Sequence, residues 1–301
     1  MLRHENIVLL KDAFRRNGKL SLVFEFVDMN LLELLERNRE GLDQDLVCKI
    51  IYQLTKAIAY CHRNDVIHRD IKLENLLINK HDYSLKLCDF GFARTMPSRD
   101  TALTDYVATR WYRAPEILVG IVRYGKEVDV WAIACIAGEI SDGQPLFPGQ
   151  SELDQLHLIQ KLLGPLTPEQ LLVFQRNDRF QGLRFPAVPK PEGLDIRYLG
   201  KAGKRAIAFM KAILVMEPKL RLTAEAACTH PWFDGRAVKP GKIVMNLPKR
   251  TIGEVVELPP INSPGRWQAL PRRKVPVVLK PRLLSTLELT GGRLVRNVIN
   301  S

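Results

Sequence analysis

The sequence has few cysteines, and they are not grouped. The five cysteines of the 301-residue chain form no Cys-x-x-Cys pair and no cluster with histidine. A disulfide framework or a zinc site needs such grouping, so we expect reduced, mostly buried thiols. Long apolar runs are also missing, because charge interrupts segments such as "VWAIACIAGEI" well before the ~20 residues that a spanning helix needs. We therefore expect no membrane segment.

The start of the sequence lacks a recognisable export signal. The residues "MLRHENIV" contain neither the apolar stretch nor the small-residue cleavage site of a signal peptide, so we expect a cytosolic or nuclear protein. With 46% hydrophobic residues, the chain can bury a full core in one large domain or two modest ones.

The net charge of +12 is unevenly divided along the chain. From Gly235 onward, 13 Lys and Arg stand against 3 Glu, so residues 1–234 carry only about +2. Eight of the 19 prolines fall in the same tail, which favours a disordered segment over a packed domain. The tail has no groove-reading motif, so we expect electrostatic binding to acidic surfaces and no specific nucleic acid. A solvated tail without a partner is the alternative.

Residues 1–234 show the hydrophobic periodicity of a folded domain. "LVCKIIYQLTKAIAYCH" has apolar residues at helical spacing, with Asp43 placed to cap its start. "EVDVWAIACIAGEI" is apolar almost all round, as in a buried central helix. "NIVLLKDAFRR" and "KLSLVFEF" are separated by Asn-Gly, which tolerates the positive φ of a tight turn, and they predict a strand hairpin.

Several motifs follow one another in a specific order. "HRDIKLEN" supplies Asp70, Lys72 and Asn75; "CDFGFAR" supplies Asp89; "TDYVATRWYRAPE", "DVWA" and "RLTAEAACTHPWF" come later. In this order, residues 1–234 resemble the protein kinase family. The resemblance implies an α+β, protein-kinase-like fold, with a mainly helical C-lobe and only the end of the β-rich N-lobe. Any one of these residues alone could be a solvated polar side chain, but the occurrence of all the motifs in this order makes that alternative much weaker.

The resemblance also implies an activity: transfer of the γ-phosphate of ATP to Ser or Thr of a protein substrate, with Mg²⁺. Asp70 would orient the substrate hydroxyl and accept its proton, and Lys72 would contact the transferring phosphoryl group. Asn75 and Asp89 would bind Mg²⁺ through oxygen. Thr109 would hydrogen-bond the pair formed by Asp70 and Lys72.

The same resemblance assigns a nucleotide-binding hinge to "LVFEFVD". The carbonyl of Glu25 and the amide of Val27 would meet adenine, and Leu77 would form the floor of the pocket. Leu73 stands where the family usually has proline, a change that affects the stiffness of the loop and not its chemistry.

Further segments, including "TRWYRAPE" and "GQPLFPGQSELDQL", are similar to the cyclin-dependent-kinase-like kinases. Thr104 and Tyr106 form a T-x-Y motif whose phosphates could pair with Arg69 and Arg94, which implies an upstream activating kinase. An unmodified loop is the alternative. Because such kinases often serve cilia and the cytoskeleton, the resemblance favours a cytoskeletal partner for the tail and a location there.

Some motif residues are expected to have structural roles. Glu116 and Arg221 should form a buried ion pair, and Asp129 should bind backbone amides of the catalytic loop. His68 should brace that loop, and His230 should close the last helix.

The family places a glycine-rich loop, a strand Lys and a C-helix Glu before the segment that matches "LRHENIV", and the sequence contains no substitute for them. Two explanations stay open: an incomplete sequence that starts at an internal Met, or a product that has lost half of its nucleotide site. The second would make the chain a catalytically impaired, kinase-fold binding module.

We predict that the 301-residue chain binds Mg-ATP far more weakly than an extended protein in which a glycine-rich loop and strand Lys precede it. Stabilisation by a ligand follows RT ln(1 + [L]/Kd), so it stays near zero when Kd is millimolar or weaker. The measurement is thermal unfolding of both proteins with and without millimolar Mg-ATP. A rise of several degrees for the 301-residue chain would contradict the prediction.

Overall fold

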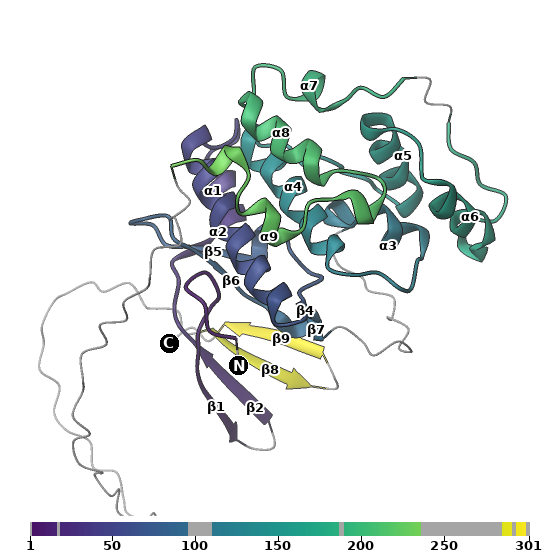
Figure 1. Cartoon of the computed structure of the whole chain (residues 1–301). Helices are drawn as coiled ribbons and strands as arrows, with labels where there is room; N and C mark the ends of the chain where they lie inside the picture. Colours follow the sequence, from purple (N-terminus) through teal and green to yellow (C-terminus); the bar gives the residue numbers. More distant parts are fainter. Residues whose placement is uncertain are drawn as a thin grey trace, which may run out of the picture.

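The computed structural model describes residues 2–16, 19–95, 110–186 and 190–235, and the backbone of two more strands at 285–290 and 293–298. Figure 1 shows a lobe of packed helices with a small sheet beneath it. In the described part of the chain, the helices are α1 (Leu31–Glu36), α2 (Gln44–Arg63), α3 (Pro115–Val119), α4 (Glu127–Asp142), α5 (Glu152–Leu163), α6 (Pro168–Arg176), α7 (Leu194–Arg197), α8 (Lys204–Ile213) and α9 (Ala224–Ala227). Helices make up most of the lobe, and the strands that the structure describes pair antiparallel within their sheets, as expected for an α+β fold.

The core of the lobe forms around α2 and α4, which pack against each other. The side chain of Asp43 accepts hydrogen bonds from the amides of Asp45 and Leu46, which confirms the predicted cap of α2. The six apolar residues at helical spacing in α2 are fully buried: Val47, Ile50, Ile51, Leu54, Ile58 and Cys61. Helix α4 is buried on all sides, which confirms its predicted central position.

Strands β1 (Leu10–Arg16) and β2 (Lys19–Phe24) form the predicted antiparallel hairpin, with Arg16 opposite Lys19. The prediction placed the start of the first strand too early, because residues 6–9 leave the hairpin. Ile7 instead forms a parallel bridge with Leu87 and is buried. The Asn6 side chain fixes this departure by donating to the Leu85 carbonyl at 3.0 Å.

Two small antiparallel sheets carry the motifs. One has the order β3 (Met29–Asn30), β5 (Leu76–Ile78), β6 (Leu85–Leu87), and the other pairs β4 (Val66–Ile67) with β7 (Arg94–Thr95). The segment "HRDIKLEN" connects β4 to β5, and "CDFGFAR" connects β6 to β7. Because β4 pairs with β7 and β5 pairs with β6, the two motif segments run between the same two sheets, which positions them for a common site.

The tail contains regular structure that the sequence analysis did not predict. Strands β8 (Ser285–Thr290) and β9 (Arg293–Val298) pair with each other, and β8 also pairs with β2, in the order β1-β2-β8-β9. The structure thus places two strands in a segment for which the sequence predicts disorder, while residues 236–284 lie outside the described part. The overlooked signal is the sequence Gly-Gly between two short runs rich in Leu and Val, which is typical of a two-residue hairpin connection.

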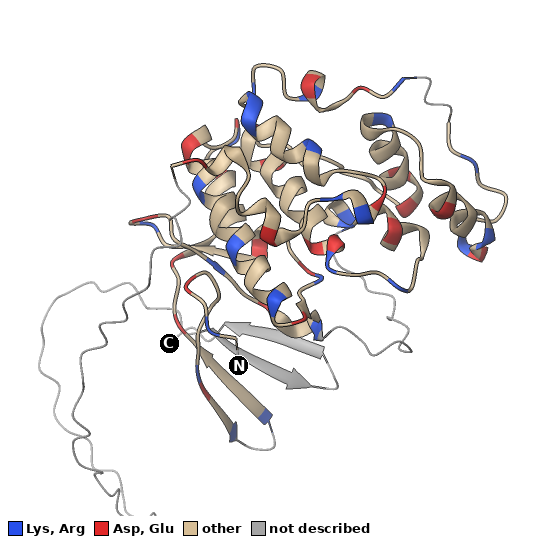
Figure 2. Cartoon of the chain, viewed as in Figure 1, with Lys and Arg blue, Asp and Glu red and all other residues tan. Residues whose placement is uncertain are grey.

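Charged residues of both signs are interspersed over the helical lobe (Figure 2), in keeping with the small net charge of residues 1–234. Among the helices that the structure describes, none is long and apolar enough to cross a membrane.

A buried ion pair joins distant parts of the lobe. Arg221, before α9, binds both carboxylate oxygens of Glu116 in α3, with distances of 2.6 Å from Nη1 to Oε1 and 2.8 Å from Nη2 to Oε2. The Arg221 guanidinium also lies 4.8 Å from the ring centre of Trp131 in α4. The predicted pair is confirmed, and its bidentate geometry fixes α3 against the segment that precedes α9.

Arg221→Gln should lower the free energy of unfolding by about 3–5 kcal/mol, because it leaves the buried Glu116 carboxylate without its partner. Urea unfolding followed by circular dichroism measures the effect. Arg205→Gln is the matched control: Arg205 is exposed and lies 3.9 Å from Asp234, so its loss should cost under about 1 kcal/mol. Equal losses in the two variants would contradict the assignment.

Candidate active site

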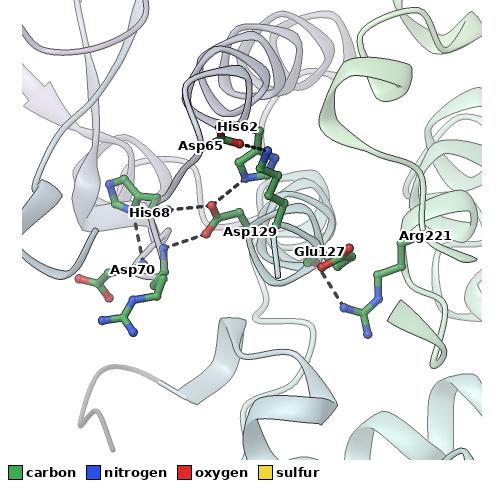
Figure 3. Close-up of polar contacts among 9 residues, drawn as sticks. His62, Asp65, His68, Asp70, Glu127, Asp129 and Arg221 are labelled. Atoms are coloured by element: carbon green, nitrogen blue, oxygen red, sulfur yellow. Dashed lines mark hydrogen bonds and ion pairs between the residues drawn. The ribbon is translucent and has the colours of Figure 1, made fainter. Parts of the chain in front are cut away.

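The loop between β4 and β5 is held by one carboxylate from the centre of the lobe (Figure 3). Asp129, in the first turn of α4 and 1% exposed, accepts hydrogen bonds from the amides of His68 and Arg69, both at 2.8 Å. His62, in the last turn of α2, lies 2.9 Å from the same carboxylate through Nε2. The predicted bonds from Asp129 to the loop are confirmed, and His62 is a support that sequence reasoning missed.

These bonds hold a backbone conformation that is otherwise unfavourable. Arg69 has a φ of 69°, in the left-handed region that non-glycine residues rarely adopt. The two hydrogen bonds from backbone amides to the Asp129 carboxylate compensate for this strain. The left-handed conformation turns the chain, so that Asp70 follows in a buried position.

Asp70, Lys72 and Asn75 meet through a single carboxylate oxygen. Oδ2 of Asp70 lies 2.9 Å from Nζ of Lys72 and 3.0 Å from Nδ2 of Asn75. Nδ2 of Asn75 also donates to the Asp70 carbonyl at 2.8 Å. The 3₁₀ turn η1 (Leu73–Asn75) brings Asn75 back to Asp70 five positions earlier. The structure thus brings together three of the predicted site residues.

Asp89 lies next to this cluster. The amide of Cys88 donates to the Asn75 carbonyl at 3.0 Å, which ties the end of β6 to η1. Asp89 follows directly, has a φ of 63°, and accepts a 3.2 Å hydrogen bond from the Gly91 amide at the start of the 3₁₀ turn η2 (Phe90–Phe92). Because Asn75 donates through its nitrogen, its side-chain oxygen is the atom that could bind a metal ion beside the Asp89 carboxylate.

His68 braces the loop from inside, as expected. Its ring is fully buried and meets the ring of Phe90 edge-on at 4.8 Å. Nε2 is 3.1 Å from the Cys88 carbonyl, and Nδ1 accepts from the Asp70 amide at 3.3 Å. This pattern requires a neutral imidazole with its proton on Nε2, and burial lowers the pKa of His68 in the same direction. His68 is therefore a structural group.

The predicted adenine-binding residues lie where β2 runs into β3. The Glu25 amide donates to the Leu9 carbonyl at 2.9 Å, and the Glu25 carboxylate accepts from the Leu9 amide and pairs with Lys86 at 2.7 Å. Lys86 in β6 stands opposite Leu77 in β5. Glu25 and the predicted floor residue are thus tied to the same sheet, and Val27 lies two residues farther along.

The predicted regulatory residues are only partly placed. Arg69 donates through Nε to the Phe92 carbonyl at 2.8 Å and through Nη1 to the Tyr124 hydroxyl at 3.0 Å. Arg94 lies in β7, opposite Ile67. Thr104, Tyr106 and Thr109 lie outside the described residues, so their predicted roles stay predictions.

Sequence reasoning missed a buried acidic side chain, Glu139 in α4. The Tyr112 hydroxyl, in the 3₁₀ turn η3 (Arg110–Tyr112), donates to Oε2 of Glu139 in α4 at 2.8 Å. Burial, with smaller contributions from the carboxylates of Glu74 and Asp142, raises the pKa of Glu139 to about 7. Oε2 of Glu74 is buried without a hydrogen-bond partner. No motif signals such a group, because it forms only when α4 and η3 pack together.

Glu139 should make stability depend on pH near neutrality. Between about pH 4.5 and about 7 the folded protein keeps a proton that the unfolded chain has released, so stability falls as the pH rises. The loss should be on the order of 3 kcal/mol over this window. Glu139→Gln keeps a carbonyl oxygen for Tyr112 but cannot titrate, so its stability should fall less. Urea unfolding of both proteins across this range is the measurement, and parallel pH profiles would rule out the assignment.

The similarity of this chain to known proteins covers much more of the sequence than the motifs. Residues 1–233 match the family model described as protein kinase domain. The mouse and human proteins named cyclin-dependent kinase-like 5 are 57% identical to the chain over 233 residues, which make up 77% of this chain and 25% and 24% of those relatives. The mouse protein named cyclin-dependent kinase-like 4 is 45% identical over 233 residues, or 67% of its length. The rabbit protein named cyclin-dependent kinase-like 2 is 46% identical over 232 residues, or 41% of its length.

The chain thus spans about a quarter of the first two relatives, and the similarity falls on the segment that carries the Asp129-supported loop. This chain belongs to the protein kinase family, among the cyclin-dependent-kinase-like kinases.

Proposed function

We propose that this kinase domain transfers the γ-phosphate of ATP to Ser or Thr hydroxyl groups of protein substrates. The observation that carries the proposal is the Asp70 carboxylate, buried and bonded through one oxygen to both Lys72 and Asn75. Phosphoryl transfer depends mainly on positioning and charge neutralisation, and a fixed carboxylate beside a fixed ammonium group supplies both.

Asp70 would orient the substrate hydroxyl and accept its proton. Its 5% exposure and its anchored loop keep the carboxylate in place before the substrate arrives. Lys72, 19% exposed at its side chain, is bonded to Asp70 and remains accessible to a phosphoryl oxygen. The pair would thus contact the nucleophile and the transferring group together.

The side chains present fit a magnesium ion. Asn75 offers an amide oxygen, since its nitrogen is used by Asp70, and Asp89 offers a carboxylate. Such oxygens are the ligands that Mg²⁺ prefers, and few protein ligands suffice because phosphate oxygens complete the coordination. When bound, Mg²⁺ would neutralise phosphate charge. The residues of this chain would fix its place, since Asn75 and Asp89 are linked through Cys88.

Recognition of adenine would use the backbone after β2. Glu25 uses its amide and its carboxylate for contacts within the protein, which leaves its carbonyl for the base. Val27 would supply the amide and Leu77 the apolar floor. The ion pair between Glu25 and Lys86 would keep this segment against the sheet.

The proposal also includes regulation by phosphorylation and a partner for the basic tail. Phosphorylation of Thr104 and Tyr106 by an upstream kinase would bring phosphates toward Arg69 and Arg94. Residues 236–284 keep most of the basic charge of the tail, which favours an acidic or cytoskeletal partner in the cytoplasm, the nucleus or the cilium.

Asp70→Asn and Asp89→Asn should each abolish phosphate transfer in the extended protein defined above and leave the fold intact. Both exchanges keep the shape of the side chain and remove the charge that positions the hydroxyl or the metal ion. Transfer from radiolabelled ATP to peptide libraries with a central Ser, Thr or Tyr is the measurement.

Asp82→Asn, in an exposed turn, is the matched control and should retain activity. Substantial turnover in either site variant would refute the assigned roles. Transfer to Tyr peptides alone would refute the proposed Ser/Thr specificity.

A further inference from the structure

Gln155, near the start of α5, is a buried polar side chain that the assigned active site does not use. It is fully buried, and both ends of its amide group are paired. Its Oε1 accepts a hydrogen bond from the Gly149 amide at 2.9 Å, and its Nε2 donates to the Trp111 carbonyl at 3.2 Å. A buried amide group without partners destabilises a protein, so these two bonds account for its place in the core. The side chain thereby joins α5 to the loop before it and to the turn η3.

Further bonds connect η3 to the same loop. The indole nitrogen of Trp111 donates to the Gly149 carbonyl at 3.2 Å, so Trp111, Gly149 and Gln155 form a closed ring of three hydrogen bonds. The approach is close enough to require glycine, because a Cβ at position 149 would lie 2.5 Å from Oε1 of Gln155. Arg110 adds a bond from Nη1 to the Gln150 carbonyl at 3.1 Å. Two consecutive residues of η3 are therefore bonded to residues 149 and 150.

The loop that receives these bonds is itself fixed to the lobe. Phe147 is 1% exposed and stacks on Trp131 of α4, with 6.0 Å between the ring centres. Asp154 accepts from the Gln150 amide at 2.9 Å, and Ser151 caps the start of α5. Helix α5 also packs against α3 (Figure 1). The turn η3 is thus bonded to a rigid part of the molecule.

The turn η3 lies next to the catalytic loop. Asp70 and Tyr112 line the same small cavity. Tyr112 is bonded to α4 through its hydroxyl, and Trp111 is bonded to α5 through its carbonyl, so two helices hold the turn. Thr109, which is predicted to hydrogen-bond Asp70, immediately precedes η3 in the sequence. A shift of η3 would therefore disturb the surroundings of the Asp70 carboxylate.

We infer that Gln155 is a positioning residue for phosphate transfer, because it holds η3 beside the Asp70 carboxylate through its bond to Trp111. The inference rests on the proposed kinase reaction and adds to it a residue that acts only through its neighbours. A displacement on the order of 1 Å near reacting groups can lower a rate about a hundredfold. The predicted adenine contacts belong to the segment after β2, so the binding of ATP should not change when Gln155 is replaced.

The hold on η3 can be tested in the 301-residue chain by exchange of the Trp111 indole proton, followed by NMR and assigned by its loss in Trp111→Phe. In Gln155→Met this proton should exchange about tenfold faster or more, because the loop that accepts it has lost a bond. Gln160→Met is the matched control, since Gln160 is buried in the same helix but bonds Leu156 and Leu166. Equal exchange in the wild type and in Gln155→Met would overturn the inference.

The effect on the reaction can be tested by steady-state kinetics in the extended protein. Gln155→Met should lower kcat about tenfold or more and leave the KM for ATP unchanged. Gln160→Met should keep both wild-type values. Amide protection in α2 gives the folded fraction of each variant, so that kcat is expressed per folded molecule. A role in stability alone predicts an unchanged kcat on this scale.

Trp111→Phe keeps the inference testable if Gln155→Met does not fold. It retains most of the ring and removes only the indole donor to Gly149, so it should lower kcat in the same direction but less. A wild-type kcat in Trp111→Phe, with Gln155→Met unfolded, would overturn the inference.

The kinetic experiment also separates the two levels of the argument. If the extended wild-type protein transfers no phosphate, the proposed function fails and the inferred role of Gln155 fails with it. Transfer by the wild type with the same kcat in folded Gln155→Met would overturn the inference alone.

Discussion

The carboxylate of Asp129 is the contact on which the active-site arrangement depends. It satisfies the amides of His68 and Arg69 at once and also meets His62, so one side chain joins α2, α4 and the loop after β4. These bonds compensate for the left-handed backbone of Arg69. The position of Asp70, and through it of Lys72 and Asn75, follows from this anchor.

The lobe contains two kinds of buried charge. The carboxylate of Glu116 binds Arg221 through both of its oxygens, so this pair holds two segments together. Glu139 accepts a hydrogen bond from a neutral hydroxyl, that of Tyr112, and its pKa is raised by burial and, to a smaller extent, by nearby carboxylates. The first arrangement contributes rigidity, whereas the second links the packing beneath the loop to the protonation state of a single group.

Much of the lobe could be predicted because its signals are local. The periodicity of α2 and α4 and the cap at Asp43 are written in contiguous sequence, and the spacing of Asp70, Lys72 and Asn75 indicates a shared loop. Contacts that need distant segments could not be predicted in the same way. The Glu139–Tyr112 bond spans 27 positions without a motif, and β8 finds β2 from the opposite end of the chain. Prolines and basic residues around the hairpin masked its short apolar runs.

The anchoring of the catalytic loop also has a consequence for folding. The bonds from Asp129 to the loop join residues 61 and 60 positions apart in the chain, and Arg69 gains nothing from its strained conformation until they form. Closing so long a segment costs entropy before the contacts can repay it, so we expect the loop to be completed late, after α2 and α4 have met. A partly folded intermediate would then have a helical core without an assembled Asp70 cluster. The Asp70 cluster would therefore be assembled in the last steps of folding.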